Sequence, residues 1–90
     1  MATVEIGPPL RRFCDGRTEL QGAGTNVLEV LLDASAQYPA LQSRVFRDDT
    51  QISATVLLYR GDGSIIFKDR ETTAVVEGDR LRLYMFVAGG

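Results

Sequence analysis

A single helical pattern, flanked on both sides by strand patterns, limits the folds open to this chain of 90 residues. Over residues 25–38, apolar side chains recur at the spacing of one helix face. The residues of this stripe are Val27, Leu28 and Leu31. Thr25 is the expected N-cap, and Pro39 ends the segment because the residue before a proline avoids the helical conformation. A helix of this kind must bury its stripe, so we expect it to pack on one face of a sheet in an α+β domain.

The expected strands are recognised by alternation of apolar and polar side chains, or by enrichment in β-branched and aromatic residues. They are residues 3–6, 17–21, 54–60, 64–67 and 81–87, with a further short element at 72–76. Gly7-Pro8-Pro9 ends the first strand, and a turn at Asp15-Gly16 predicts that the first two strands form a hairpin. The strand at 54–60 is expected to be buried. Residues 10–13 show no clear pattern, and residues 39–50 indicate a short helical turn followed by a loop.

Charge and composition exclude several classes of function. Ten Lys and Arg residues against twelve Asp and Glu give a net charge of −2, and no basic stripe is present to neutralise nucleic-acid phosphates. No apolar run approaches the ~20 residues of a membrane span, and no signal peptide is recognisable, so we expect a cytoplasmic protein. With no histidine and one cysteine, Cys14, we expect no His-based catalytic triad, no metal site and no internal disulfide.

The last strand, residues 81–87, is the most informative segment. Its alternation directs four apolar residues toward the helix: Leu81, Leu83, Met85 and Val87. The opposite face carries Arg82, Tyr84 and Phe86. A solvent-facing strand needs no aromatic rings, and such rings are enriched in protein interfaces, so these three residues form a predicted partner-binding patch. The alternative is that a second element of the chain covers them.

The sequence ends in Val87, Ala88, Gly89 and Gly90, which we expect to form a flexible tail behind a domain of residues 1–86. Extended at about 3.3–3.6 Å per residue, these four residues would project roughly 13–14 Å. Two glycines contribute no packing, but without Cβ atoms they can enter a narrow channel. The Gly90 carboxylate would then reach the active site of another protein. The alternative is a frayed terminus without function.

Three parts of the sequence together resemble the ThiS/MoaD-type ubiquitin-like sulfur carriers. The first is Gly78-Asp79 followed by an alternating strand and Val87-Ala88-Gly89-Gly90. The second is the strand at 3–6 with Leu10-Arg11 and the glycine-led start of the helix, and the third is Tyr38-Pro39-Ala40-Leu41 at the helix end. Length and N-terminal spacing are most similar to the cysteine-pathway carriers, and next to the small subunit of molybdopterin synthase. The family often has proline where this chain has Met85.

The resemblance implies a β-grasp fold, in which a mixed sheet of four to five strands packs on one main helix. It also implies that an E1-like adenylating enzyme uses ATP to activate the Gly90 carboxylate, and that sulfur then converts the acyl-adenylate into a thiocarboxylate. The chain would be a carrier without bound cofactor, not an enzyme, and a monomer when free. It would deliver sulfur to a biosynthetic enzyme that makes cysteine, molybdopterin or another thio-metabolite. Two alternatives stay open: a ubiquitin-like modifier conjugated to lysines of target proteins through Gly90, and a non-covalent binding module.

Two further features are predicted to be structural. Gly61-Asp62-Gly63-Ser64 lacks the Gly-Lys-Ser/Thr ending of a phosphate-binding loop and is expected to be a turn. Cys14 has no histidine or second cysteine nearby in the sequence to activate it, so we expect it in a loop or in the core. Neither feature is expected to take part in the chemistry.

Overall fold

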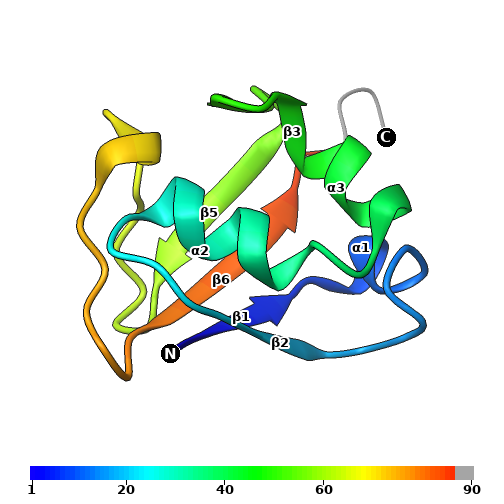
Figure 1. The fold of residues 1–90 in the computed structure, drawn as a ribbon, viewed down its shortest axis with the longest axis horizontal. Coiled ribbons are helices and arrows are strands. Elements are labelled where there is room, and N and C mark those ends of the chain that lie inside the picture. Colours follow the sequence, from blue (N-terminus) through cyan, green and yellow to red (C-terminus); the bar gives the residue numbers. More distant parts are fainter. Residues whose placement is uncertain (87–90) are drawn as a thin grey trace.

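The computed structural model describes residues 1–86 as an α+β fold (Figure 1). Val87, Ala88, Gly89 and Gly90, which make up the predicted tail, lie outside the described residues. The strands are β1 (Ala2–Ile6), β2 (Glu19–Gly22), β3 (Phe46–Asp48), β4 (Gln51–Ile52), β5 (Val56–Arg60) and β6 (Arg80–Met85). The helices are α1 (Pro8–Arg11), α2 (Val27–Ala34), α3 (Pro39–Val45) and the 3₁₀-helix η1 (Arg70–Thr72). None of these helices has the length and apolar character needed to cross a lipid bilayer.

Four strands form a mixed sheet in the order β2-β1-β6-β5. β1 pairs antiparallel with β2 and parallel with β6, and β6 pairs antiparallel with β5. A parallel pair requires a crossover connection, and this crossover includes α2, which packs across one face of the sheet (Figure 1). We call the face toward α2 the inner face and the opposite one the outer face. The predicted mixed sheet of four to five strands on one main helix is therefore confirmed.

Apolar residues from both layers meet in one core between α2 and the inner face. The helix contributes Val27, Val30, Leu31 and Ala34. The sheet contributes Val4, Ile6, Val56, Leu58, Leu81 and Leu83, each no more than 2% exposed. β2 approaches the helix so closely that a Cβ atom at Gly22 would lie 2.3 Å from the carbonyl oxygen of Val30. The packing of this edge strand on α2 therefore requires glycine at position 22.

The main helix is shorter than predicted, and its cap lies one residue further along the chain. α2 covers Val27–Ala34 instead of residues 25–38, and its N-cap is Asn26 rather than Thr25. The Asn26 side-chain oxygen accepts the Glu29 N–H (2.9 Å), while Glu29 Oε1 accepts the N–H of Thr25 (2.7 Å). Asn26 caps the helix because its side chain reaches the N–H three residues on, and the Glu29 carboxylate in return holds the residue before the cap; three residues after Thr25 stands Leu28, which has no side-chain acceptor.

The buried stripe of α2 also differs in part from the predicted one. Leu31 and Val30 are fully buried, and Ala34 continues the stripe one turn later. Leu28 is only partly buried against the core, because the inward face follows i, i+3, i+4 and i+7 spacing from the first residue of the helix. The helix ends where the buried Ser35 hydroxyl donates to the Leu31 carbonyl oxygen (2.7 Å), well before the proline that was expected to end it.

The connection between β1 and β2 is longer than a tight hairpin. Pro8 and Pro9 end β1 as predicted, but they also begin α1, because proline suits the first turn of a helix. Of the residues without a clear pattern, 10–11 therefore complete this short helix, and 12–13 begin the turn that follows it. Asp15 and Gly16 do form a turn with positive φ angles of 57° and 75°, and the chain then returns antiparallel to β1.

The segments after α2 agree in part with the prediction. The short helical turn after Pro39 is present as α3. Of the loop predicted at 48–50, residues 49–50 form a turn and Asp48 ends β3, but the small antiparallel pair β3–β4 on either side of this turn was not predicted. Residues 64–67 form a single bridge, from Ile65 to Tyr59, instead of a strand. The element expected at 72–76 is likewise one bridge, between Asn26 and Ala74. These segments pair too briefly to form strands.

Candidate functional site

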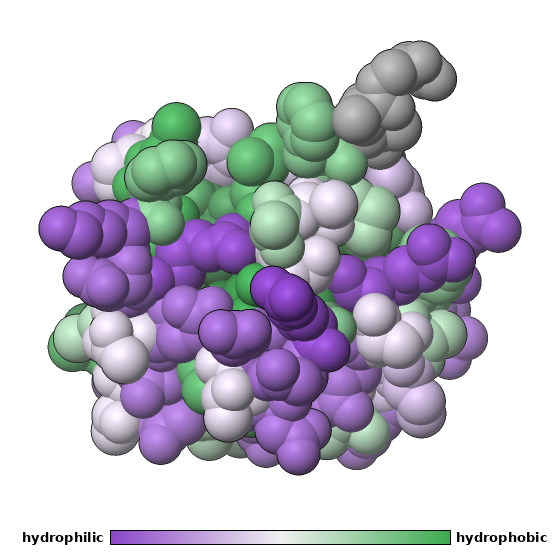
Figure 2. Space-filling model, turned by 90° about the horizontal axis from the view of Figure 1, so that it is seen from above, coloured by the Kyte–Doolittle hydropathy of each residue, from purple (hydrophilic) through white to green (hydrophobic). Residues whose placement is uncertain are grey.

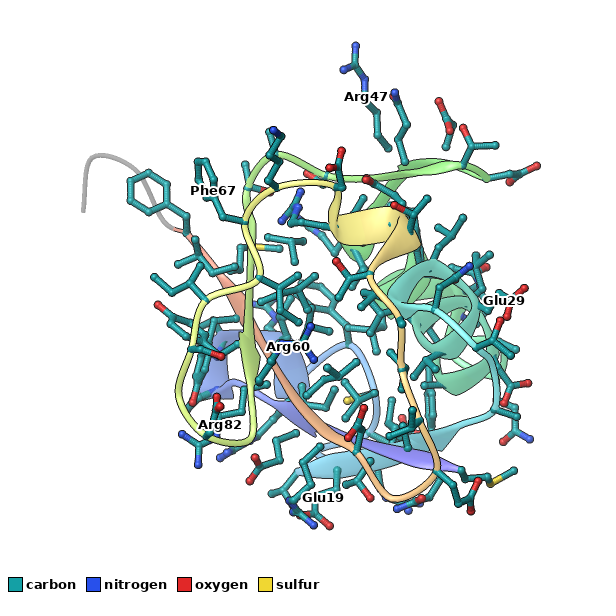
Figure 3. The ribbon with its side chains drawn as sticks, turned by 90° about the vertical axis from the view of Figure 1, so that its left-hand side faces the viewer. Glu19, Glu29, Arg47, Arg60, Phe67 and Arg82 are labelled. Atoms are coloured by element: carbon teal, nitrogen blue, oxygen red, sulfur yellow. The ribbon has the colours of Figure 1, made fainter. Side chains whose placement is uncertain are left out.

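β6 alternates between the two faces of the sheet as its sequence predicts. Leu81 and Leu83 are 1% and 2% exposed on the inner face, whereas Tyr84 and Phe86 are 36% and 57% exposed. Arg82 is half-buried and projects from the outer face (Figure 3). The predicted register is therefore confirmed for residues 81–86, Val87 lies outside the described residues, and the role of the outward side chains stays a prediction.

β5 contributes two side chains to the same region of the outer face. The strand register places Leu57 opposite Tyr84 and Tyr59 opposite Arg82. The rings of Tyr59 and Tyr84 meet edge to face, with centroids 5.6 Å apart. We define Leu57, Tyr59, Tyr84 and Phe86 as the aromatic patch. The prediction of a fully buried β5 is wrong for its outer face, because no element of the described chain shields Leu57, which is 37% exposed.

The aromatic patch borders a shallow hollow of about 460 Å³. It is lined by Leu57, Tyr59, Gly63, Arg82 and Tyr84. The loop after β5 adds two exposed apolar side chains, Ile65 (61%) and Phe67 (85%). Phe67 projects toward the same side of the molecule as Arg82 (Figure 3), and Figure 2 shows hydrophobic residues gathered next to the point where the described chain ends. This apolar surface has no covering layer within residues 1–86.

Tyr84 is seated on Gly7, the residue between β1 and α1. The Gly7 N–H donates to the Leu83 carbonyl oxygen (2.8 Å), which extends the pairing of β1 with β6 by one residue. A Cβ atom at position 7 would lie 2.5 Å from Tyr84 Cδ1 and 3.0 Å from the Leu83 oxygen. Gly7 therefore does more than end a strand: its missing side chain leaves room for the Tyr84 ring.

The end of β6 is fixed by the segment that precedes β5. The Phe86 N–H donates to the Thr55 carbonyl oxygen (2.6 Å). The Arg70 guanidinium donates to the carbonyl oxygen of Ser53 in that segment (Nη2, 2.9 Å) and to that of Val56, the first residue of β5 (Nη1, 2.5 Å). The backbone of Phe86, the last described residue and a member of the aromatic patch, is thus held by a hydrogen bond rather than by a proline at position 85.

The other part of the outer face carries charged residues that pair with one another. Arg82 Nε donates to Glu5 Oε2 (3.0 Å), and Arg80 forms an ion pair with Glu19. Arg80 Nη2 also lies 3.7 Å from Glu5 Oε1. We call Glu5, Glu19, Arg80 and Arg82 the ionic half of the outer face. Arg82, a predicted patch residue, therefore lines the hollow while its charge is paired within the protein.

Two features were predicted to be structural: Cys14 and the turn at 61–63. Cys14 is fully buried, and burial raises the pKa of its thiol above the ordinary value. The turn at 61–63 is closed by Asp62 Oδ1, which accepts the N–H (2.9 Å) and the hydroxyl (2.7 Å) of Ser64. Within residues 1–86, no three His, Cys, Asp or Glu side chains group together as metal ligands.

Sequence reasoning found the β6 part of this surface and missed the rest. Leu57, Ile65 and Phe67 were not singled out, because their exposure depends on which elements cover β5 and the loop after it. A usable signal was the apolar character of residues 65–67, a segment with turn residues on both sides and too few residues for a paired strand.

No model of a known protein family matches the chain. The sulfur carrier protein CysO of Mycobacterium tuberculosis is 27% identical over 90 residues, which cover 98% of this chain and 97% of that protein. CysO of Mycobacterium bovis is similar to the same extent. The similarity therefore extends over nearly the whole of both proteins.

Two solved structures share the fold over nearly their full length. One chain of the BexX/CysO complex of Amycolatopsis orientalis is 25% identical, with a TM-score of 0.83 and 100% of both chains covered. A structure of the small archaeal modifier protein 1 of Haloferax volcanii is 25% identical, with a TM-score of 0.73 over 96% of this chain and 97% of the other. By sequence and by structure, this chain has a β-grasp fold and resembles the ThiS/MoaD-type ubiquitin-like sulfur carriers.

Proposed function

We propose that this chain is a sulfur carrier whose Gly90 carboxylate is adenylated by an E1-like partner enzyme and then converted to a thiocarboxylate. The observation that carries the proposal is the similarity to the CysO sulfur carrier proteins over 98% of the chain. Val87, Ala88 and Gly89 connect the reactive end to the domain. The chain acts as a protein cosubstrate in the cytoplasm, and ATP is bound and used by the partner enzyme.

The proposed chemistry starts from a group that is a poor electrophile, because a carboxylate would have to expel oxide. A Gly90 carboxylate oxygen attacks the α-phosphorus of ATP, the bond to pyrophosphate breaks, and an acyl-adenylate forms. Sulfide from a sulfur donor then adds to the acyl carbon, the C–O bond to AMP breaks, and AMP leaves with the electron pair. No oxidation or reduction occurs in either step, and this chain supplies no acid, base or metal.

The geometry of the outer face supports a docking role for the aromatic patch. Exposed Tyr84 and Phe86 are side chains of the type enriched in interfaces, and they lie at the end of β6, where the Thr55 carbonyl oxygen fixes the backbone. An enzyme that binds the patch would meet the segment leading to Gly90 at a fixed starting point. The BexX/CysO structure contains a CysO protein in complex with a second protein. We expect comparable complexes here, first with the adenylating enzyme and then with a sulfur-accepting biosynthetic enzyme.

Intact-mass measurement tests the chemistry directly. The full chain is incubated with an E1-like adenylating enzyme of the source organism, ATP and sodium sulfide. We expect its mass to increase by the difference between one sulfur and one oxygen atom, and we expect the increase to require ATP. An unchanged mass under conditions in which the enzyme is active would contradict the proposal.

Two variants serve as matched controls for the position of the reaction. One lacks Gly90 and the other carries one serine after it, so both keep residues 1–86 intact. Both should retain the circular dichroism spectrum and unfolding midpoint of the unaltered chain and should lose the mass increase. Conversion of either variant at the normal rate would show that the Gly90 carboxylate is not the reacting group.

A second candidate function is that of a ubiquitin-like modifier, favoured by the structural similarity to small archaeal modifier protein 1. In that function, a lysine amine of a target protein attacks the same acyl-adenylate, AMP leaves, and an isopeptide bond forms at Gly90. Sulfide is not needed. Conjugates of higher mass on a denaturing gel, formed with ATP in a lysate of the source organism and absent without Gly90, would identify this function.

A further inference from the structure

Two arginines from different helices share one aromatic ring at the end of the molecule that holds α1 and α3. Arg12 follows α1, and Arg44 lies in the last turn of α3. Their guanidinium carbons lie 5.2 Å and 4.7 Å from the centroid of the Phe13 ring. Both arginines are exposed, whereas Phe13 is partly buried against the core. We call these three residues the arginine cluster.

Neither arginine of the cluster has an acidic partner among residues 1–86. Arg80 and Arg82 form ion pairs, and Arg70 donates to backbone carbonyl oxygens. Arg12 and Arg44 form no ion pair with any described carboxylate. Other basic side chains, among them Arg47 and Arg60, also lack an ion pair within residues 1–86, so Arg12 and Arg44 are distinguished by their shared position over one ring.

The two guanidinium groups are close enough to act together on one acidic surface. Because both lie over the same ring, their carbons are within about 10 Å of each other. Contact with the ring leaves N–H groups of both exposed guanidinium groups available for hydrogen bonds. It also restricts the side chains in advance, so less conformational entropy is lost when a carboxylate is bound bidentately.

The arginine cluster borders the end of β6. α1 packs against β6, and Gly7, directly before α1, contacts the Tyr84 ring of the aromatic patch. Figure 1 shows α1 and α3 at the end of the sheet toward which β6 runs. We propose that the arginine cluster is a second docking element, which binds an acidic surface of the adenylating enzyme while the aromatic patch binds an apolar one. This inference rests on the proposed sulfur-carrier function.

An acidic protein surface fits the cluster better than a nucleic acid does. Two cations are few for binding a phosphate backbone, and the acidic pair Asp48 and Asp49 lies only a few residues beyond Arg44. A protein surface, in contrast, can place one or two carboxylates against the arginines and avoid the acidic pair. The adenylating enzyme is the first protein that a carrier must meet, and charge complementarity speeds such an encounter.

Steady-state adenylation kinetics test the cluster. In the double variant Arg12→Glu/Arg44→Glu, we expect KM for the carrier to rise roughly tenfold or more with kcat unchanged, because docking is impaired and chemistry is not. KM of the unaltered chain should rise with salt, and KM of the variant should depend on salt much less. The matched control is Arg47→Glu/Arg60→Glu, which makes the same change in net charge at two other positions (Figure 3).

Two further variants separate docking from folding and geometry from charge. Arg12→Lys/Arg44→Lys keeps the charges but removes the planar guanidinium groups, so we expect an intermediate KM. Arg12→Gln/Arg44→Gln should retain the fold by circular dichroism and should have a raised KM. A normal KM in both the Glu and the Gln double variants, or an equal loss in the matched control, would overturn the inference.

The experiment also distinguishes failure of this inference from failure of the proposed function. If the unaltered chain is adenylated and the cluster variants match it, only the docking role of the cluster is wrong. If the unaltered chain is not adenylated at all, the sulfur-carrier proposal fails, and the inference built on it fails as well.

Discussion

The outer face of the four-stranded sheet carries paired charges on β2, β1 and the first half of β6, but aromatic and apolar side chains, most of them exposed, on β5 and at the end of β6. In the ionic half, Glu5 and Glu19 meet Arg82 and Arg80. In the aromatic patch, the rings of Tyr59 and Tyr84 meet each other, and Tyr84 and Phe86 stay exposed. β6 thus contributes to the ionic half, whose charges are paired within the protein, and to the aromatic patch, whose apolar side chains are left partly in water.

This difference indicates which of the two regions yields more binding free energy when a partner covers it. Covering the ionic half would remove water from charges that already have partners, which brings little free energy or costs some. Covering the aromatic patch would bury apolar area that the monomer leaves in water. The patch also includes Phe86, the residue that precedes the predicted tail. The surface with the most to gain from a partner is therefore the one nearest to the proposed chemistry.

Tyr84→Asp is expected to have the largest effect, because it places a charge in the centre of the aromatic patch. We expect binding to the adenylating enzyme to weaken by about 2–4 kcal/mol, which is roughly 30-fold or more in Kd. The free energy of unfolding should fall far less, since the ring is 36% exposed. Calorimetric titration and urea unfolding measure the two quantities.

The matched control is Gln21→Asp, which makes the same change in charge at an exposed position of β2, on the side of the sheet that carries the ionic half. It should leave partner binding nearly unaltered. Equal losses in the two variants would mean that net charge, rather than the aromatic patch, determines binding. If Tyr84→Asp unfolds and Gln21→Asp does not, Tyr84 belongs to the core, and the aromatic patch is not a free binding surface.

Gly7→Ala tests whether the position of the Tyr84 ring depends on the missing side chain below it. The added Cβ atom would meet Tyr84 Cδ1 at 2.5 Å, so we expect a loss of about 1–3 kcal/mol in the free energy of unfolding, as for an overpacked site. Gly61→Ala is the control, because its Cβ atom would come no closer than 3.3 Å to any atom. In a Tyr84→Ala background the cost of Gly7→Ala should shrink. A cost that persists there would identify the Leu83 carbonyl oxygen as the obstacle instead.

The sequence predicted the parts of this arrangement that depend on local pattern. Alternation in β6 was sufficient to direct Leu83 inward and Tyr84 outward, because a strand buried on one face has a period of two. The start of α2 was misplaced by one residue although its signal is local: Glu29 stands three residues after Asn26, the spacing of a capping box. α1 was missed because Pro8 was interpreted only as the end of a strand.

The parts that could not be predicted depend on pairing between distant segments. Leu57 and Tyr59 belong to the aromatic patch because β5 pairs with β6 in one register, and a shift by one residue would send both side chains into the core. The contact of the Tyr84 ring with Gly7 depends on the parallel pairing of β1 with β6, two strands that are far apart in the sequence. Neither relation has a signature in the neighbouring residues.

The ionic half should contribute only a small free energy. A double-mutant cycle of Glu5→Gln and Arg82→Gln should give a coupling of about 0.2–1 kcal/mol by urea unfolding, and the coupling should fall with added salt. The side chains of Arg82 and Glu5 are 43% and 33% exposed, so solvent screens the pair. Partner binding should change much less in Arg82→Gln than in Tyr84→Asp. An equally large loss would place Arg82 in the interface and remove the distinction between the two halves.

The smallest expected effect concerns the turn that borders the aromatic patch at Gly63. The Asp62 carboxylate accepts hydrogen bonds from the Ser64 N–H and the Ser64 hydroxyl. These bonds, the first more than the second, hold the pKa of Asp62 below its ordinary value of 3.8. A lowered pKa in the folded state means that the charged carboxylate stabilises the turn above pH 3.8, and that this stabilisation is lost as the pH falls through the folded value. Carboxyl NMR titration should show the low pKa, and Ser64→Ala should bring it part of the way back. An ordinary pKa in the unaltered chain would mean that the turn is not held by this carboxylate. The hollow beside Tyr84 would then have a mobile wall, and only the strands would fix the aromatic patch.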